Sequence, residues 1–401
     1  MPVEAANERS NTVLGAAEAR GDVRSPPGQP RTARSAPTLE EICGRSPFSG
    51  PVLRPLHRFS STGSFLSTER RRAGAPLRRH CWSGEMKAAR VPRALLRYAS
   101  VQGGLLSRQQ LATGGVNRHR LVTLVKHREL VHVTRNVYDW PRARDASSTL
   151  QAGSEYDVHR IRSAWTGLLS AEASVATGAA ALALHGVWGL PTRITPEISL
   201  RGRGGSAGAR GVRVRQFARP FPVSVVHGRY AAAPEAALVQ ALPELGFRRA
   251  VAVVDSALNR GLIAPVHMSQ IRDELRGRRG VARLGRWWEF VDGRAESPVE
   301  TWARLDCRAA NLPPPTVQAE IRDSRGKLVA RADLGWEREC GTWVLVEIDG
   351  REFHETPRAL FRDRARQNQI VLEGRHTVLH FTGRDVREGK VARAIARALQ
   401  G

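Results

Sequence analysis

The segments Ser297-Pro298-Val299-Glu300, Arg331-Ala332-Asp333 and Val346-Glu347-Ile348-Asp349-Gly350 follow one another late in the sequence, and His354 comes shortly after them. They place acidic residues at the start of an expected helix and on expected strands. Carboxylate oxygens at strand ends can hold a hard divalent cation against a phosphate group and a water molecule. This stretch therefore predicts the fold of the C-terminal domain, and it contains the strongest candidates for catalytic residues in the chain.

A predicted β-hairpin carries the first strand carboxylate. Residues 317–321 and 328–334 flank the turn Asp323-Ser324-Arg325-Gly326, a composition typical of a hairpin connection. Asp333 lies near the end of the second strand between two apolar residues. Because a charge in an apolar strand needs a partner, we expect Asp333 to take part in a polar site.

The next strand, residues 343–349, supplies two further carboxylates. Successive side chains of a strand point to opposite faces, so Glu347 and Asp349 share one face. Together with Asp333 from the neighbouring strand they would repel one another unless a cation lay between them. The spacing predicts a metal site, and an edge strand with a solvated acidic face is the alternative.

Glu300 has a second interpretation. Ser297, Pro298 and Glu300 occupy the cap, the first and the third positions of a predicted helix, which is the pattern of a capping box. Taken alone, Glu300 is therefore interpreted as part of a helix cap.

Composition sets the broad class of protein. The chain has 401 residues, of which 41% are hydrophobic, enough for two or three domains with ordinary cores. We find no apolar run of the roughly 20 residues that a membrane span needs, and no signal-peptide pattern. The four cysteines are far apart, which favours neither disulfides nor a zinc site. We expect a cytoplasmic protein without a membrane partner.

The charge favours a nucleic-acid partner but does not decide it. The formal net charge is +25, and neutralisation of phosphates by basic residues supplies most non-specific affinity for DNA. However, all but four of the 63 basic residues are arginine, a bias that a high genomic GC content would also produce.

Two interpretations apply to residues 1–85. They are rich in Arg, Pro, Ser and Gly and show no sustained apolar period, which predicts disorder. Met86 stands directly before the first convincing helical pattern, so a translation start at Met86 is the other interpretation.

Residues 86–142 have the pattern of a winged helix-turn-helix. A helix is expected to end at Gly103-Gly104, Ser107 and Asn117 are expected to cap two more helices, and a hairpin with its turn at Arg135-Asn136 follows. The third helix would present to the major groove of DNA the residues Arg118, His119, Arg120, Lys126 and Arg128. A small helical domain with a solvated basic face is the alternative.

Residues 150–265 predict a middle α/β module. Helices are expected over 171–184, around 235–245 and over 251–260, and strands over 197–200 and 212–216. A loop at Gly277–Gly280 precedes the C-terminal domain, residues 285–401. The predicted fold class is therefore multi-domain α/β.

Residues 297–386 resemble the Vsr-related endonuclease-like domains, family 559 of the domains of unknown function, in the PD-(D/E)XK nuclease superfamily. The resemblance covers about a hundred residues and rests on the acidic motifs above with Gln318, Arg362-Asp363-Arg364, Val378-Leu379-His380-Phe381-Thr382 and Asp385. Less sharply, residues 92–140 resemble the winged-helix domain of AbiEi-type antitoxins of type IV toxin–antitoxin systems. The segment from Ser174 to Pro191 is similar to the region that follows that domain.

The first resemblance implies DNA cleavage that depends on Mg²⁺ or Mn²⁺, with the metal held by Asp333 and Glu347 and with help from Glu300. The superfamily pattern has a lysine two residues after the motif glutamate, where this sequence has Asp349. Vsr-like enzymes dispense with that lysine and employ a histidine, so the resemblance implies that His354 assists a metal-bound water. A structural histidine is the alternative.

Two functions follow as expectations. The first is a DNA-binding protein whose C-terminal domain is a restriction-endonuclease-like α/β/α domain that hydrolyses phosphodiester bonds. The second is a transcriptional regulator or antitoxin-like protein, with a toxin as its partner and an inactive nuclease fold. The oligomeric state is not predicted by the sequence.

Overall fold

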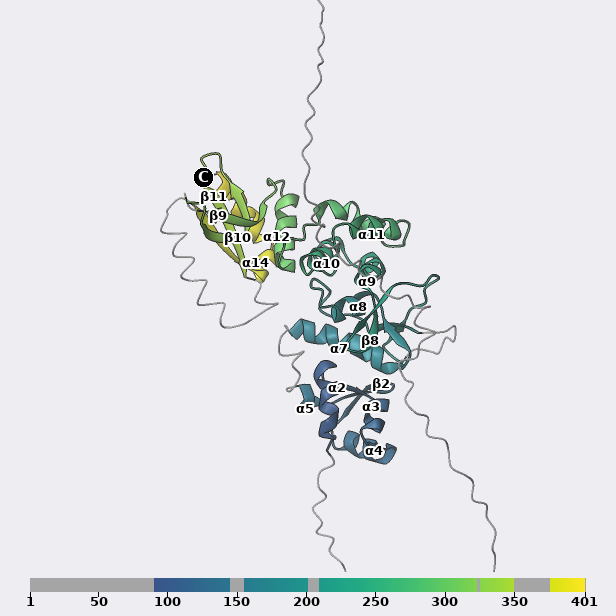
Figure 1. Ribbon diagram of the computed structural model, residues 1–401. Helices are drawn as coiled ribbons and strands as arrows, with labels where there is room; N and C mark the ends of the chain where they lie inside the picture. Colours follow the sequence, from purple (N-terminus) through teal and green to yellow (C-terminus); the bar gives the residue numbers. More distant parts are fainter. Residues whose placement is uncertain (1–89, 145–154, 201–208, 323–324, 350–375, 401) are drawn as a thin grey trace, which may run out of the picture. The chain divides into compact units, whose positions relative to one another are not determined.

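The computed structural model describes residues 90–144, 155–200, 209–322, 325–349 and 376–400 (Figure 1). The expectations for residues 1–85 and for His354 lie outside these ranges. Within them the chain is a mixed α/β protein with three sheets, as predicted. None of its described helices is long and apolar enough to span a bilayer.

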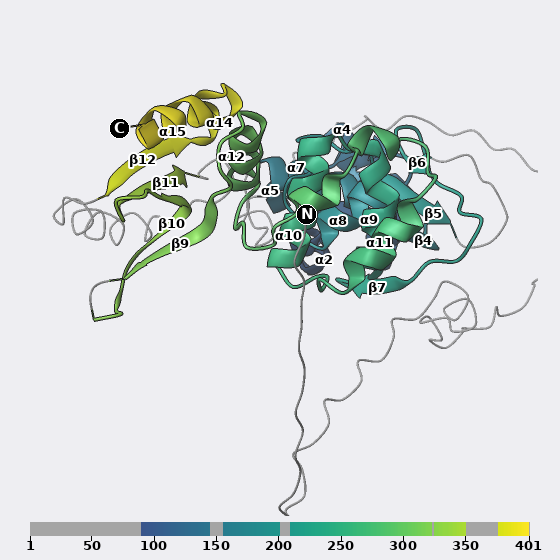
Figure 2. The same ribbon diagram turned by 90° about the horizontal axis from the view of Figure 1, so that it is seen from above.

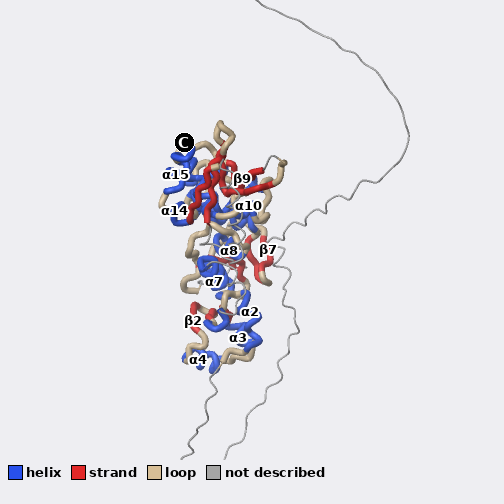
Figure 3. The backbone as a smooth tube through the Cα atoms, turned by 90° about the vertical axis from the view of Figure 1, so that its left-hand side faces the viewer, coloured by secondary structure: helices blue, strands red, loops and turns tan. Residues whose placement is uncertain are grey.

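The first sheet is built together with short helices. The elements, traced in Figure 3, are η1 (Arg93–Leu95), α2 (Leu96–Val101), β1 (Leu105–Ser107), α3 (Arg108–Thr113), α4 (Arg118–Lys126), β2 (Val131–Thr134), β3 (Val137–Asp139) and α5 (Pro141–Arg144). The strands are antiparallel in the order β1-β3-β2. Strand β1 was not expected from the sequence.

The predicted helix caps of this region are confirmed. Ser107 Oγ accepts the backbone N–H of Gln110, whose side chain accepts the N–H of Ser107 in return. Asn117 Oδ1 accepts the N–H of Arg120 at 2.8 Å. Each cap satisfies backbone donors that the first turn of a helix leaves unpaired, and so fixes where α3 and α4 begin.

The second sheet has five strands in the order β6-β5-β4-β8-β7. Its strands are β4 (Ser174–Ala176), β5 (Glu197–Leu200), β6 (Arg213–Val214), β7 (Val223–Val226) and β8 (Arg229–Ala232). The helical elements are α7 (Glu155–Ser170), α8 (Gly178–Leu184), α9 (Pro234–Ala241), η2 (Leu242–Glu244), α10 (Phe247–Asn259), α11 (His267–Leu275), η3 (Ala282–Leu284) and η4 (Trp287–Phe290).

One predicted helix in this region is wrong. The structure divides residues 171–184 into the buried strand β4 and the helix α8. Strand β4 pairs with β5 on one side and with β8 on the other, so tertiary pairing overrides the helical preference of the alanine-rich sequence.

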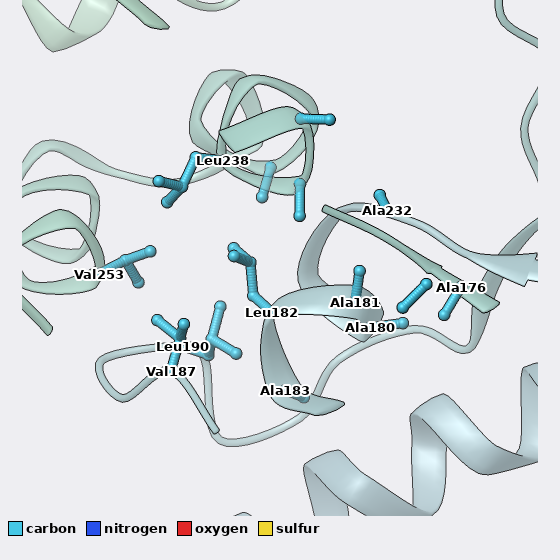
Figure 4. Packing of buried hydrophobic residues seen from close by; sticks show 14 of the residues in the cluster. Ala176, Ala180, Ala181, Leu182, Ala183, Val187, Leu190, Ala232, Leu238 and Val253 are labelled. Carbon is cyan, nitrogen blue, oxygen red and sulfur yellow. The ribbon is translucent and has the colours of Figure 1, made fainter. Parts of the chain in front are cut away.

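Alanines set the spacing of the core around α8 (Figure 4). Leu182 lies between Leu238 of α9 and the pair Val187 and Leu190, all of them buried. The small side chains that surround it include Ala176, Ala180, Ala181, Ala183 and Ala232. Side chains of this size let α8 approach the sheet and α9 closely, which explains the alanine richness of the sequence.

The third sheet forms the C-terminal domain. Its order is β12-β11-β10-β9, and its elements are α12 (Pro298–Ala309), β9 (Thr316–Arg322), β10 (Leu328–Glu337), β11 (Trp343–Asp349), β12 (Thr377–Thr382), α14 (Gly383–Arg387) and α15 (Lys390–Gln400). The predicted hairpin β9–β10 is confirmed, β10 and β11 are antiparallel, and β11 and β12 are parallel. Helices α12, α14 and α15 lie on one face of the sheet (Figure 2).

The alternation predicted for β11 is also confirmed. Val344, Val346 and Ile348 pack against the helices, whereas Leu345 belongs to a cluster on the other face. Glu347 and Asp349 therefore share the face of Leu345.

The hairpin β9–β10 changes faces in its middle. Leu334 packs with the helices, but Ala332, two residues earlier, packs on the opposite face of the sheet. Residues two apart on a regular strand share a face, so both strands must rotate at this point. Gln318 on β9 supplies the break with a φ of 55°, and Asp333 occupies the corresponding place on β10. The break frees Asp333 from the regular pattern and turns it toward β11.

Candidate functional site

Helix α12 and strand β10 bring two carboxylates together. Glu300 in the first turn of α12 is buried, with 5% of its surface exposed. Burial, and next the negative charge of Asp333, raises the pKa of Glu300 to about 7. Two residues 33 positions apart in the sequence thus share one site, as the metal-site prediction requires.

Hydrogen bonds orient the Glu300 carboxylate. Its Oε2 accepts the backbone N–H of Glu296 and the side-chain amide of Gln318, both at 2.9 Å. Ser297 caps the helix as predicted, since its Oγ accepts the N–H of Glu300. Only half of the expected capping box is present, because the Glu300 side chain bonds to Glu296 rather than to the N–H of Ser297. Its carboxylate therefore belongs to the acidic site as well as to the helix end.

Asp333 is fixed from the neighbouring strand. Its Oδ2 accepts the backbone N–H of Ile348 on β11 at 2.7 Å. Burial raises the pKa of Asp333 to about 6, although this hydrogen bond favours the ionised form, and the charge of Glu347 raises the pKa further. The fold therefore holds Asp333 between the other two carboxylates.

Glu347 lies beside a histidine that the sequence did not single out as a site residue. The parallel pairing of β11 and β12 places His380 opposite Glu347, and His380 Nδ1 lies 3.3 Å from Glu347 Oε2. Asp349 is exposed at the end of β11, opposite Thr382. His354, which was predicted to assist a metal-bound water, lies outside the described residues. His380 lies beside one of the predicted metal ligands, Glu347.

The carboxylates of this site have the right chemistry for a divalent metal, but the described residues do not supply a complete set of ligands. Carboxylate oxygens are the ligands that Mg²⁺ and Mn²⁺ prefer. Across residues 90–400, apart from the segments that the structure does not describe, no group of three or more His, Cys, Asp or Glu side chains is arranged to hold a metal ion. The residues therefore fit a metal by chemistry, whereas a complete set of ligands is not formed by the described part of the chain.

The predicted DNA-contact residues lie on or next to α4. Arg118, His119 and Lys126 are exposed, and in the described chain their side chains make no hydrogen bond or ion pair. Leu121 and Leu124 are buried on the opposite face, which fixes the outward direction of these cations. On the outward side, Val122 is 62% exposed between Arg118 and Lys126.

The surroundings of the other two residues differ from those of these three. Arg120 donates a hydrogen bond to the carbonyl oxygen of Arg90 at 2.9 Å, so it fastens the start of this domain to α4. Arg128 is exposed but lies beyond the end of α4, with a φ of 58°. The helix itself therefore presents three of the five predicted side chains without a competing contact.

A buried polar cluster joins α12 to α10 and was missed by sequence reasoning. Asp255 is 1% exposed, and its oxygens accept from Thr301 Oγ1 at 2.8 Å and from Arg304 at 2.9 Å. They also accept the N–H of Asp292, and burial raises the pKa of Asp255 to about 7. An aspartate in an apolar helix was the only signal that could have revealed this cluster.

Similarity to known proteins is limited. The uncharacterized proteins MT2308 (strain CDC 1551 / Oshkosh) and Rv2248 (strain ATCC 25618 / H37Rv) of Mycobacterium tuberculosis are each 34% identical to this chain over 176 residues. The matched segment makes up 43% of this chain and 63% of each relative. No family model matches the chain, and no solved structure matches it.

Proposed function

We propose that this chain is a DNA-binding protein whose C-terminal domain hydrolyses phosphodiester bonds with the aid of Mg²⁺ or Mn²⁺. The placement of Asp333 near Glu300 of α12 and also near Glu347 of β11 carries this proposal. Buried carboxylates that raise the pKa of one another are costly to a fold, and such pairs are concentrated at functional sites.

The arrangement of residues 90–144 supports the DNA-binding part. Three helices followed by a hairpin, with β1 added to its sheet, is the order of elements in a winged helix. In such domains the third helix enters the major groove, and here that helix is α4. Arg118 and Lys126 would contact phosphates, whereas His119 and Val122 face the base edges.

The hydrolytic part assigns a function to each carboxylate. Asp333 and Glu347 would hold the metal, and Glu300 would help from α12. Bound there, Mg²⁺ would offset the repulsion between the carboxylates and act as a Lewis acid toward the phosphate. Gln318 and the N–H groups of Glu296 and Ile348 orient the carboxylates, and His380 is placed to accept or hold a proton beside Glu347.

A second candidate is a regulator or antitoxin-like protein that binds DNA and does not cut it. Two observations favour it: Asp349 stands where the nuclease superfamily that this domain resembles has a lysine, and the described residues do not complete a set of three metal ligands. In this case α4 would still bind DNA, and a toxin protein would be the partner of the remaining surface.

A cleavage assay separates the two. Purified full-length protein is incubated with supercoiled and linear DNA in Mg²⁺, in Mn²⁺ or with a chelator. We expect nicking that requires the metal and falls at least a hundredfold in Asp333→Asn and in Glu347→Gln. Glu320→Gln, which removes an exposed carboxylate on β9 paired with Arg322, should cut like the wild type.

Thermal unfolding gives a second readout that does not depend on cleavage. Mg²⁺ should raise the melting temperature of the wild type and of Glu320→Gln but not that of Asp333→Asn, because a ligand that binds only the folded state stabilises it. DNA binding without nicking, and without a metal-dependent shift in melting temperature, would replace the hydrolase by the regulator.

A further inference from the structure

A small hollow lies away from the carboxylates, between α3 and the five-stranded module. Its volume is about 280 Å³. Drug-sized ligands occupy pockets of roughly 300–1,000 Å³, so this one suits a single small group. The residues that line it are Ser107, Arg108, Gln109, Ala112, Asn136, Leu169, Ser170, Ala171, Glu172 and Arg229.

Two arginines of this lining have few acceptors among the residues that the structure describes. Arg108 makes no hydrogen bond or ion pair through its side chain within the described residues. Arg229 donates one long bond, of 3.3 Å, to the carbonyl oxygen of Glu172. A guanidinium has five N–H donors in a planar fork, so most donors of both side chains are available to a ligand.

Arg229 is partly buried, so water can replace fewer of its missing hydrogen-bond acceptors. Loss of hydration lowers the pKa of Arg229, and the charge of Glu172 offsets only part of that loss. Glu172 is the one acidic residue among the ten that line the hollow, against two arginines. The site therefore has a net positive charge and too few acceptors.

We propose that this hollow binds a phosphate-type oxyanion, held between Arg108 and Arg229. A planar guanidinium matches two oxygens of a phosphate at once, and the hollow has room for a phosphate group with little attached to it. The bound group is either the phosphate of a small metabolite or a backbone phosphate of DNA. This site goes beyond the proposed function, because it involves neither the carboxylates nor the outward face of α4.

Its position gives the site a means to act on DNA binding. Arg108 is the first residue of α3, and only four residues, 114–117, separate the end of α3 from the start of α4. An anion that bridges Arg108 to Arg229 of β8 would tie α3 to the five-stranded module. Binding would then be coupled to the placement of α4.

Binding of inorganic phosphate to the full-length protein tests the proposal at constant ionic strength. We expect phosphate to raise the melting temperature and to give a saturable heat of binding in calorimetry. Arg108→Gln and Arg229→Lys should each weaken this binding about tenfold or more. The matched control Arg219→Gln also alters an exposed arginine of the five-stranded module, away from the hollow, and should bind phosphate like the wild type.

A second measurement distinguishes the two sources of the phosphate. If the occupant is a DNA phosphate, Arg108→Gln should lower the slope of log Kd against log salt by about one contact, and free phosphate should compete with DNA. If the occupant is the phosphate of a small metabolite, Arg108→Gln should lose phosphate binding, while the salt slope of its DNA binding stays unchanged. The proposal would be overturned if the wild type bound no phosphate and if both variants kept the DNA affinity and the salt slope of the wild type. Because Arg108 is exposed, its variant is expected to fold, and this outcome is decisive.

Discussion

At the scale of single residues, the most informative side chain is Glu300. The fold buries its carboxylate next to that of Asp333 and gives it hydrogen bonds from Glu296 and Gln318. These N–H donors favour the ionised carboxylate, whereas burial and the neighbouring charge favour the neutral form, and burial has the largest effect. The residue is thus held in a costly environment, as is usual for groups that act on a ligand.

This environment predicts how stability depends on pH. The pKa of Glu300 is raised from 4.5 to about 7 on folding, so the folded protein holds a proton that the unfolded chain has lost. The stabilisation that the protonated Glu300 contributes is fully present below about pH 4.5 and is lost as the pH rises through 7. Glu300→Gln should therefore be more stable than the wild type at pH 8, on the order of 3 kcal/mol, and nearly equal to it below pH 4.5.

Urea unfolding of both proteins across this pH range measures the effect. Glu320→Gln is the control, since Glu320 is exposed and pairs with Arg322. Its stability curve should run parallel to that of the wild type. A parallel curve for Glu300→Gln as well would show that Glu300 is not held in the environment described.

At the scale of single elements, α4 shows that residues of one type on one helix do different things. Arg118 and Lys126 extend outward without a partner in the described chain, whereas Arg120 bonds to the backbone of Arg90. Their charges are equal, so the sequence could not separate an outward cation from one that bonds to the backbone. The contact partner, 30 residues away, makes the difference.

The proposed DNA contact therefore predicts unequal effects along α4. Arg118→Gln and Lys126→Gln should each weaken DNA binding and lower its salt slope by about one, because each removes a phosphate contact. Arg120→Gln should instead lower the melting temperature, with a smaller effect on the salt slope. Fluorescence anisotropy with duplex DNA at several salt concentrations gives both slopes, and equal slopes for all three variants would contradict this division.

Elements whose signals are local could be predicted from the sequence. The caps at Ser107 and Asn117, the hairpin β9–β10 and the alternation along β11 depend on residues a few positions apart. Strand β4 could not be predicted, because the alanine-rich stretch 171–184 that contains it favours a helix, and only pairing with β5 and β8 makes residues 174–176 a strand.

The candidate site, like the fold, could be predicted from the sequence only in part. The acidic motif drew attention to Glu300, Asp333 and Glu347, which the fold brings together. Their supports could not be found from the motif. His380 reaches Glu347 only because β11 and β12 are parallel and in this register, and Gln318 reaches Glu300 only because β9 breaks there.

At the scale of the whole molecule, α12 connects the C-terminal domain to the helices before it. One side of α12 packs on the four-stranded sheet and carries Glu300, and Thr301 and Arg304 on another side bond to Asp255 of α10. A second pair, Arg248 with Asp306, joins the same two helices at a more exposed place. The proposed active site therefore depends on an anchor outside its own domain.

The two pairs between α10 and α12 make a matched comparison. Arg304→Met leaves the carboxylate of Asp255, which is 1% exposed, without its cation, and breaking a buried pair in this way costs roughly 3–5 kcal/mol. Arg248→Met breaks a pair whose arginine is 46% exposed, and such surface pairs contribute about 1 kcal/mol or less. Urea unfolding at pH 8, above the raised pKa of Asp255 of about 7, should show this difference in the free energy of unfolding.

The double variant Asp255→Asn with Arg304→Met separates the anchor from simple packing. If the loss in Arg304→Met comes from an unpaired buried carboxylate, replacing that carboxylate by the neutral amide of Asn should restore much of the stability, and the double-mutant cycle should give a coupling of about 2 kcal/mol or more. Phosphodiester cleavage measured in the same proteins should recover less than stability does, because neither new side chain holds α12 through Thr301 and Arg304 together. Equal destabilisation by Arg304→Met and Arg248→Met, with no coupling, would show that α12 is placed by its apolar face alone.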